Sequence, residues 1–316
     1  MAPTRPATVI APKALRPGDR IALVAPASPF DRDEFERGVA EVAALGFEPV
    51  SDDRVFARRG YVAGEPALRA ASFLDAWRDP GIAALIAIRG GYGSMQLLPL
   101  LDRDTIRAHP KLFVGYSDTT AILTFLTQQC GIVAVHGPMI EGRLARGAEG
   151  YDRGSFLACL TRPEPMREVP ARALRPIVPG DASGMLTGGT LSQLVASLGT
   201  PYAFDPPPGA VLFFEDVAER PYRLDRMVTQ LRFAGILDRA AAIIWGEMPR
   251  CDETTGPTAR DTIADLFRGF QGPVVFGLPS GHATTPAVTL PFGVRCRVVA
   301  GPQRTSVSID EAAVSA

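Results

Sequence analysis

Short apolar runs alternate with amphipathic stretches through the first half of this 316-residue chain. The run from Arg20 to Pro26 is almost continuously apolar, which is typical of a strand buried on both faces. Between Asp33 and Leu45 apolar side chains recur at helical spacing, and Gly46 follows as a stop signal. The expected strands lie at 20–26, 47–50, 82–88, 111–115 and 132–136, and the expected helices at 33–45, 66–77 and 119–126. Buried strands that alternate with helices predict a parallel sheet covered on both faces.

The pattern changes after about residue 160. Five prolines fall between Pro163 and Pro179, which is typical of a linker or a domain boundary. Strands are expected beyond it at 211–214, 240–245, 274–276, 287–290, 295–299 and 306–309, with helices only at about 222–234 and 258–268. The predicted fold is therefore α/β: an N-terminal parallel-sheet α/β sandwich domain and a second, β-rich, barrel-like C-terminal domain.

The domain boundaries follow from these changes of pattern. We expect a flexible lead over residues 1–14 and an α/β domain over 15–162. A proline-rich linker over 163–182 would then connect it to the β-rich domain over 183–316.

Composition narrows the class of protein. The net charge is -1 and 46% of the residues are hydrophobic, so bulk charge favours neither a nucleic-acid partner nor an anionic membrane surface. The four cysteines are far apart and form no CxxC pair, which disfavours a zinc site or a disulfide framework. No apolar stretch reaches the length of a membrane span, and the proline-interrupted N-terminus does not resemble a secretory signal. A cytoplasmic protein is expected.

The tetrapeptide Gly115-Tyr116-Ser117-Asp118 carries the strongest chemical signal. It separates the expected strand at 111–115 from the expected helix at 119–126. A serine at such a bend has its hydroxyl lifted clear of the backbone and lies at a helix N-terminus, where free N–H groups favour developing negative charge. Ser117 is therefore a candidate nucleophile.

A serine nucleophile needs a base and an acid that orients the base. Of the three histidines, His109 is expected in a surface loop, His136 at the end of a strand, and His282 in a loop between two strands of the second domain. Glu215 and Glu219 follow the strand at 211–214, and Glu215 is preferred because the strand end fixes its position.

Glycines in the segment Arg89-Gly-Gly-Tyr-Gly93 allow backbone N–H groups to approach a ligand closely. The segment could supply half of an oxyanion hole, with the N–H of Asp118 as the other half. It lacks the GxGxxG spacing of a dinucleotide site.

Together these motifs make the chain similar to the LD-carboxypeptidase family of serine peptidases, which includes murein tetrapeptide carboxypeptidases and microcin C immunity proteins. The similarity extends from about Leu15 to about Val299. The segments that carry it are 15–28, 88–93, 114–118, 136–138, 186–191, 214–216, 222–227 and 281–282.

The resemblance implies a catalytic set of Ser117, Glu215 and His282, with oxyanion donors on the backbone of Gly91 and Asp118. It implies an N-terminal domain that holds the serine, a C-terminal domain that supplies acid and base, a homodimer, and no metal or organic cofactor. The implied substrate is a small peptide, a murein fragment recycled in the cytoplasm, from which an L,D-amide cleavage releases D-alanine.

Two departures from the family pattern concern the residues that face the substrate. Thr190 stands where asparagine is common, and the segment Trp245–Cys251 is unusual. A terminal carboxylate would suit a bidentate arginine, and four arginines are candidates: Arg89, Arg143, Arg220 and Arg223.

Other readings remain open from the sequence. An amidase acting on peptidyl or aminoacyl adenylates would need an aromatic platform, for which Trp245 is a candidate although a core position is expected. An α/β-hydrolase esterase is disfavoured because the second glycine of G-x-S-x-G is missing. A non-catalytic peptide-binding protein is disfavoured by the serine, acid and histidine positions. His136 remains an alternative base.

Overall fold

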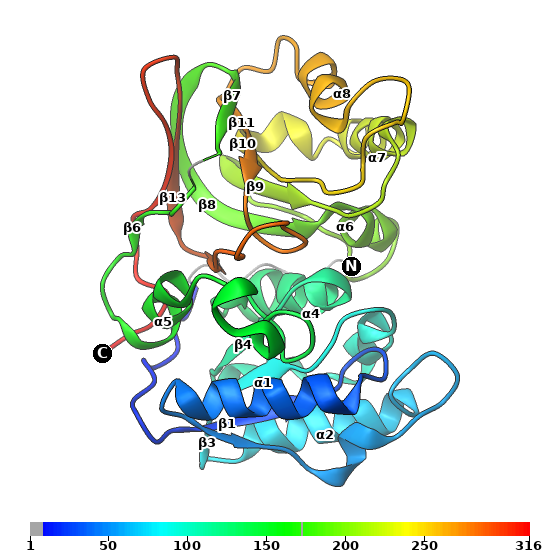
Figure 1. Cartoon of the computed structure of the whole chain (residues 1–316), viewed down its shortest axis with the longest axis vertical. Coiled ribbons are helices and arrows are strands. Elements are labelled where there is room, and N and C mark those ends of the chain that lie inside the picture. The colour runs from blue at the N-terminus through cyan, green and yellow to red at the C-terminus, as the bar shows by residue number, and fades with distance from the viewer. Residues whose placement is uncertain (1–8, 172) are drawn as a thin grey trace.

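The computed structural model describes residues 9–171 and 173–316, which form two sheets with helices packed on them (Figure 1). The first sheet has the strand order β12-β5-β4-β3-β1-β2. Its strands are β1 (Arg20–Val24), β2 (Glu48–Val50), β3 (Ile82–Ala87), β4 (Leu112–Gly115), β5 (Ala134–His136) and β12 (Leu290–Phe292). Strands β1 to β5 pair in parallel, as the alternating sequence pattern predicts.

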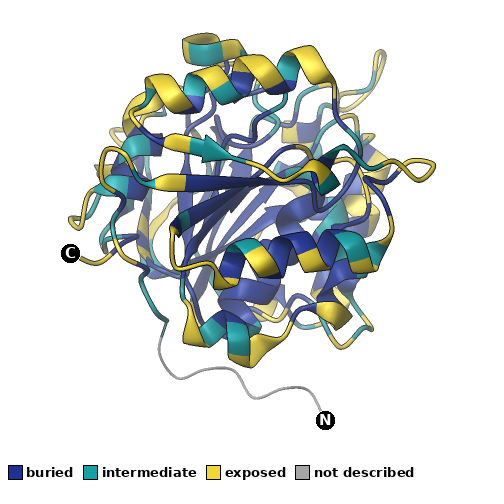
Figure 2. Cartoon of the chain, turned by 90° about the horizontal axis from the view of Figure 1, so that it is seen from below, coloured by how far each residue is buried: buried dark blue, intermediate teal, exposed yellow. Residues whose placement is uncertain are grey.

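Helices pack on the first sheet. They are α1 (Arg32–Ala44), α2 (Pro66–Arg78), α3 (Arg103–Ala108), α4 (Thr120–Thr124) and α5 (Arg153–Thr161). Helices α1 and α2 each bury an apolar side and expose a polar one, whereas the short α4 is buried throughout. The carboxylate of Asp31 caps α1 by accepting a hydrogen bond from the N–H of Glu34 at 2.9 Å. Figure 2 shows buried strands beneath helices whose outer faces are exposed.

The second sheet has the strand order β6-β14-β13-β8-β9-β10-β11-β7. Its strands are β6 (Arg167–Glu168), β7 (Arg175–Val178), β8 (Gly180–Thr190), β9 (Ala210–Glu215), β10 (Ala240–Gly246), β11 (Val274–Leu278), β13 (Arg295–Ala300) and β14 (Thr305–Ile309). Strands β8 to β11 are parallel and the others antiparallel. Because β7 also lies near β13, the sheet curls towards a barrel.

Helices α6 (Leu191–Ser197), α7 (Pro221–Phe233) and α8 (Ala259–Leu266) pack on the outer side of the second sheet. They bury a separate apolar cluster that includes Trp245. The larger cluster runs from the first sheet into the inner face of the second, so Val114 of β4 and Phe213 of β9 share one core. The two halves are therefore joined by continuous apolar packing.

One strand was assigned wrongly from the sequence. The run at 287–290 was expected in the second domain, but the strand that forms there, β12, pairs antiparallel with β5 in the first sheet. Leu290 and Phe292 are fully buried at that edge of the first sheet. The assignment was wrong because the pattern of the sequence shows that a strand is apolar but does not show which sheet it joins. The chain thus returns from the second sheet to the first before it ends.

Two segments of the predicted domain plan have structure of their own. Strands β6 and β7 lie within 163–182 and pair at opposite ends of the second sheet. The predicted lead at 1–14 lies partly outside the described residues, and in its described part Ile10 bridges to Ile132. Within 9–171 and 173–316, every helix is too short or too polar to cross a bilayer.

The core makes a direct prediction about stability. Phe113 of β4 is fully buried against Phe73, whereas Phe233 at the end of α7 is 86% exposed. Phe113→Ala should lower the free energy of unfolding by about 3–5 kcal/mol, and Phe233→Ala by less than about 0.5 kcal/mol. Urea unfolding of both variants measures the difference, and equal losses would contradict the described core.

Candidate active site

Ser117 lies at a strained bend between β4 and α4. Its φ is 62°, in the left-handed region that residues other than glycine rarely adopt. A single 3₁₀ turn, Ser117–Thr119, leads directly into α4. Gly115 allows the bend, because a β-carbon there would collide with the Thr119 hydroxyl. Ser117 is only partly buried while Tyr116 and Asp118 beside it are buried, which is the arrangement expected of an exposed hydroxyl on a rigid turn.

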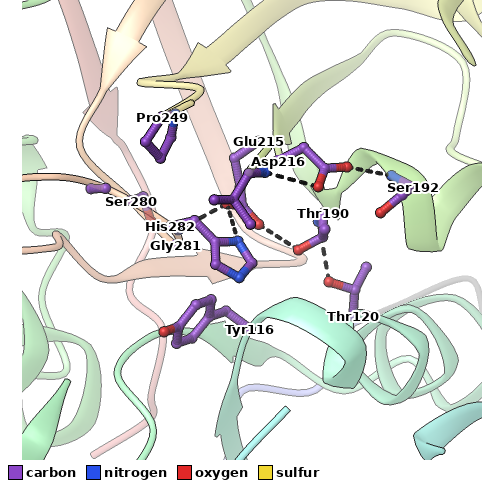
Figure 3. A network of polar contacts seen from close by, with 12 residues as sticks. Tyr116, Thr120, Thr190, Ser192, Glu215, Asp216, Pro249, Ser280, Gly281 and His282 are labelled. Carbon is purple, nitrogen blue, oxygen red and sulfur yellow. Dashed lines mark hydrogen bonds and ion pairs between the residues drawn. The ribbon is translucent and has the colours of Figure 1, made fainter. Parts of the chain in front are cut away.

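Glu215 and His282 form a direct hydrogen-bonded pair. Nδ1 of His282 lies 2.8 Å from Oε2 of Glu215, and the backbone N–H of His282 donates to the same oxygen at 2.9 Å (Figure 3). The Thr190 hydroxyl donates to the other carboxylate oxygen. Glu215 ends β9 and is only 1% exposed, so three donors hold a fully desolvated carboxylate.

The charges of this pair support each other. Burial by itself would raise the pKa of Glu215, but the imidazoles of His282 and His136 and the Thr190 hydrogen bond together outweigh it and hold that pKa well below its usual range. Burial by itself would lower the pKa of His282, and the Glu215 carboxylate outweighs it, so the pKa of His282 is raised. The hydrogen bond at Nδ1 leaves Nε2 as the nitrogen available for proton transfer.

Contacts between neighbours connect this pair to the Ser117 bend. The ring of Tyr116 meets the ring of His282 edge-on, with centroids 5.0 Å apart. The N–H of Thr190 donates to the Thr120 hydroxyl at 3.2 Å, which links the end of β8 to the start of α4. The described residues include no hydrogen bond from the Ser117 hydroxyl to His282, a contact that often forms only when substrate binds.

His136 occupies the opposite side of Glu215. Its Nε2 lies 4.0 Å from Oε1 of Glu215, and its Nδ1 lies 3.2 Å from the Ser280 hydroxyl. The ring is completely buried, and this burial lowers the pKa of His136 to about 4. A neutral, enclosed imidazole is poorly placed to exchange protons with a substrate. His109, by contrast, is exposed at the end of α3.

The glycine loop after β3 lies directly against the bend. A β-carbon on Gly90 would lie 2.9 Å from Cβ of Ser117 and 3.4 Å from the backbone nitrogen of Asp118. Gly91 has a φ of 90° and also has no room for a side chain. The backbone of this loop therefore approaches Ser117 as closely as glycine permits. The Asp118 carboxylate points elsewhere and accepts a hydrogen bond from the N–H of Ser94 at 2.8 Å.

Two polar residues of the site went unrecognised from the sequence. Ser28 ties the glycine loop down: its N–H donates to Gly90 O at 3.1 Å, and its hydroxyl accepts from the N–H of Tyr92 at 3.1 Å. Asp216 lies behind Glu215 and accepts from the N–H of Ser192 at 2.8 Å. Burial and the adjacent Glu215 raise the pKa of Asp216 to about 6. Serine and aspartate are too common for these roles to be read from a single sequence.

The other candidates are placed as follows. Trp245 is fully buried between Phe214 and Phe267, so its ring is enclosed by the core. Glu219 pairs with Arg223 at the surface, which favours Glu215 as the buried acid. Within the described residues, His, Cys, Asp and Glu side chains form no group of three or more placed to hold a metal ion.

The arginines considered for a substrate carboxylate are already engaged by protein groups. Arg89 donates to Pro29 O at 2.7 Å and lies 3.5 Å from Glu141. Arg220 lies 3.4 Å from Glu253. Arg143 is buried and donates to four backbone carbonyls.

Comparisons with known proteins point to one family. Residues 21–137 match the family model described as the LD-carboxypeptidase N-terminal domain, and residues 183–298 match the C-terminal one. A Streptomyces coelicolor protein with a carboxypeptidase name is 37% identical over 90% of this chain and 92% of its own length.

Solved structures agree with this match. A muramoyltetrapeptide carboxypeptidase from Oxalobacter formigenes superposes with a TM-score of 0.81 at 30% identity, over 93% of this chain and 99% of that one. MccF in complex with glutamyl sulfamoyl guanosine superposes with a TM-score of 0.86 at 25% identity, over 96% and 99% of the two chains.

Gly281 provides a test of the site's packing. Its φ is 68°, and a β-carbon there would lie 2.6 Å from Cδ of Glu215 and 2.9 Å from Cε1 of His136. Gly269 has a φ of 89°, and a β-carbon there would have no atom within 4 Å. Gly269→Ala should therefore cost only the backbone strain, about 1–2 kcal/mol. Gly281→Ala should lower the free energy of unfolding by at least about 1 kcal/mol more. Denaturant unfolding compares the two, and equal losses would mean that the space beside Glu215 is not tight.

Proposed function

The chain belongs to the LD-carboxypeptidase family, and on that premise we propose that it is a serine carboxypeptidase that hydrolyses an L,D-amide bond with Ser117, Glu215 and His282. The observation that carries the proposal is the 2.8 Å contact between Glu215 and His282. This pair lies beside the strained bend that carries Ser117, since the ring of Tyr116 contacts His282.

The roles follow from the geometry of each group. Nε2 of His282 accepts the proton of Ser117 as the hydroxyl oxygen attacks the scissile carbonyl. Glu215 holds the imidazole in the required tautomer and stabilises its cation. The backbone N–H groups of Gly91 and Asp118 stabilise the oxyanion, each worth about 2.7–4 kcal/mol of barrier in comparable enzymes. His282 then protonates the leaving amine, and water releases the acyl group.

We propose a murein tetrapeptide as the substrate and a terminal D-alanine as the leaving group. The choice is supported by the similarity to a muramoyltetrapeptide carboxypeptidase, which extends over nearly the whole length of that protein. The setting we propose is cell-wall recycling in the cytoplasm, with the enzyme acting as a homodimer.

A second candidate substrate is a peptidyl or aminoacyl adenylate. Its support is the likeness to MccF, whose structure holds a sulfamoyl nucleoside. With Trp245 enclosed, the aromatic rings that remain available near the glycine loop are Tyr61 and Tyr92, which are 71% and 52% exposed and pack edge-on.

Product analysis separates the two substrates. Mass spectrometry should detect D-alanine released from an L,D-tetrapeptide but not from its all-L counterpart. An aminoacyl sulfamoyl-adenosine incubated in parallel should remain intact. If only the aminoacyl sulfamoyl-adenosine were cleaved, the second candidate would be selected. If neither that compound nor the tetrapeptide were cleaved, both candidates would be rejected.

Ser117→Ala tests the nucleophile. Removing the serine of such a catalytic set lowers kcat by about 10⁶-fold, and binding is retained. A fluorophosphonate probe should label the wild-type protein and leave Ser117→Ala unlabelled. Ser51→Ala, which alters an exposed serine away from the bend, should still be labelled. Labelling of Ser117→Ala would refute the assignment.

The pH dependence of kcat/KM tests the base. Because Glu215 raises the pKa of His282, the imidazole becomes protonated, and so inactive as a base, at a pH above the ordinary value of about 6.5. Activity should therefore fall on the acid side with an apparent pKa above 6.5. In Glu215→Gln this limb should move to lower pH while kcat falls by about 10⁴-fold. Histidine NMR of the variant provides the control, and an unmoved His282 pKa would contradict the pairing.

A further inference from the structure

Arg143 lies outside the proposed catalytic set, yet it hydrogen-bonds to the loop that carries His282 and interacts with Tyr116 beside Ser117. It follows β5 in the first half of the chain and is only 6% exposed. One terminal nitrogen, Nη2, donates to Gly281 O and to Ala283 O, each at 2.6 Å. These two carbonyls flank His282 on either side. A single guanidinium therefore holds the backbone on both sides of the proposed base.

The same side chain anchors the rest of the loop. Nη1 of Arg143 donates to Gly150 O at 3.1 Å and to Thr285 O at 3.4 Å. The segment from Arg143 to Gly150 folds back on itself, and its two ends are so close that a β-carbon on Gly150 would collide with the Arg143 carbonyl. Ala287, at the far end of the loop, donates to Gly150 O at 3.1 Å. The loop between β11 and β12 is thus fastened to the first half of the chain along its length.

Arg143 also reaches the other side of the site. Its guanidinium lies beside the buried hydroxyl of Tyr116, where it opposes the rise that burial causes in the pKa of that phenol. Tyr116 precedes Ser117 directly and contacts the His282 ring. One cation therefore interacts electrostatically with the residue before the proposed nucleophile and donates hydrogen bonds to both neighbours of the proposed base.

The chemistry of the contacts requires arginine in particular. Guanidinium presents five N–H donors in a rigid planar fork, whereas the lysine ammonium offers three from a single point. Four donors to carbonyl oxygens already exceed what lysine can provide. Burial of a cation without a paired carboxylate is unfavourable unless its hydrogen bonds are satisfied, and within the described residues Arg143 forms no ion pair.

We propose that Arg143 is a positioning residue that fixes the distance between the base on the second half of the chain and the nucleophile on the first. The inference rests on the proposed hydrolytic function. In this role the Arg143 guanidinium binds backbone carbonyls of the protein, so Arg143 is no longer a candidate for binding a substrate carboxylate. Catalysis is sensitive to such placement, because a shift of about 1 Å in a reacting group can cost about 10²-fold in rate.

The test compares Arg143→Ala and Arg143→Lys with Arg146→Ala and Arg146→Lys. Arg146 lies in the same segment and is exposed, which makes it a matched control. Steady-state hydrolysis of the L,D-tetrapeptide should show kcat lowered about 10²-fold in Arg143→Ala and at least about tenfold in Arg143→Lys, with KM changed little. Both Arg146 variants should match the wild type.

Added guanidinium ion distinguishes positioning from a general loss of structure. It should restore part of the kcat of Arg143→Ala and should not affect Arg146→Ala. If Arg143→Ala does not fold, the kcat of Arg143→Lys, which retains the buried charge, is compared with that of Arg146→Lys instead. A raised KM with an unchanged kcat would instead place Arg143 on the substrate and overturn the proposal, as would activity equal to the Arg146 variants.

The fluorophosphonate probe separates failure of this inference from failure of the proposed function. A wild-type protein that neither hydrolyses the peptide nor reacts with the probe would reject the function itself. An active wild type, with Arg143 variants labelled at the wild-type rate, would reject only the role of Arg143. Slower labelling of Arg143→Ala is the expected result.

Discussion

A carboxylate removed from water is destabilising unless donors surround it, and Glu215 is such a carboxylate. Much of the described architecture supplies those donors. The end of β8 brings the Thr190 hydroxyl, and the loop before β12 brings both the backbone and the ring of His282. The donors come from two parts of the chain that are distant from each other in sequence, so the charge at Glu215 is stable only when both have assembled around β9. Folding of the site and folding of the two-sheet body are therefore coupled.

The path of the chain makes this coupling stronger. After β11 in the second sheet, the chain crosses to the first sheet as β12 and then returns as β13. The loop that carries His282 is the outward crossing. Arg143 fastens it from the first sheet, and Glu247 holds it from the second by accepting from the N–H of Thr284 at 2.6 Å. A loop that is held from both sides can keep the His282 imidazole in one orientation, although the tip of the loop at residues 284–286 is exposed.

Much of the fold could be predicted from sequence because its signals are local. The strand–turn–helix at Ser117 and the alternating first half depend on residues close together in the chain. The long strand β8 was not predicted, since its sequence Gly180-Asp-Ala-Ser-Gly-Met-Leu-Thr-Gly-Gly-Thr190 lacks an apolar pattern and is rich in glycine. Pairing with β9, the next strand in sequence, and with the more distant β13 creates the strand.

The limits at the site have the same cause. Glu215 was preferred because a strand end fixes its position, whereas His282 was assigned as the base only through the family resemblance. No spacing in the sequence places the two side chains 2.8 Å apart. Ser28 and Arg143 act through backbone carbonyls and N–H groups, which carry no side-chain signature. A role that depends on the shape of a loop can be recognised only when the loop is seen.

The crossing of β12 also means that the chain has no clean cut site between its halves. A fragment ending before the proline-rich segment would lack β12, which pairs with β5 along the margin of the first sheet. Unpaired backbone N–H and C=O groups of β5 would then face solvent, and an open strand margin of this kind recruits other chains. An N-terminal fragment cut at this boundary would thus self-associate through the exposed margin of β5, so the two halves must be expressed together.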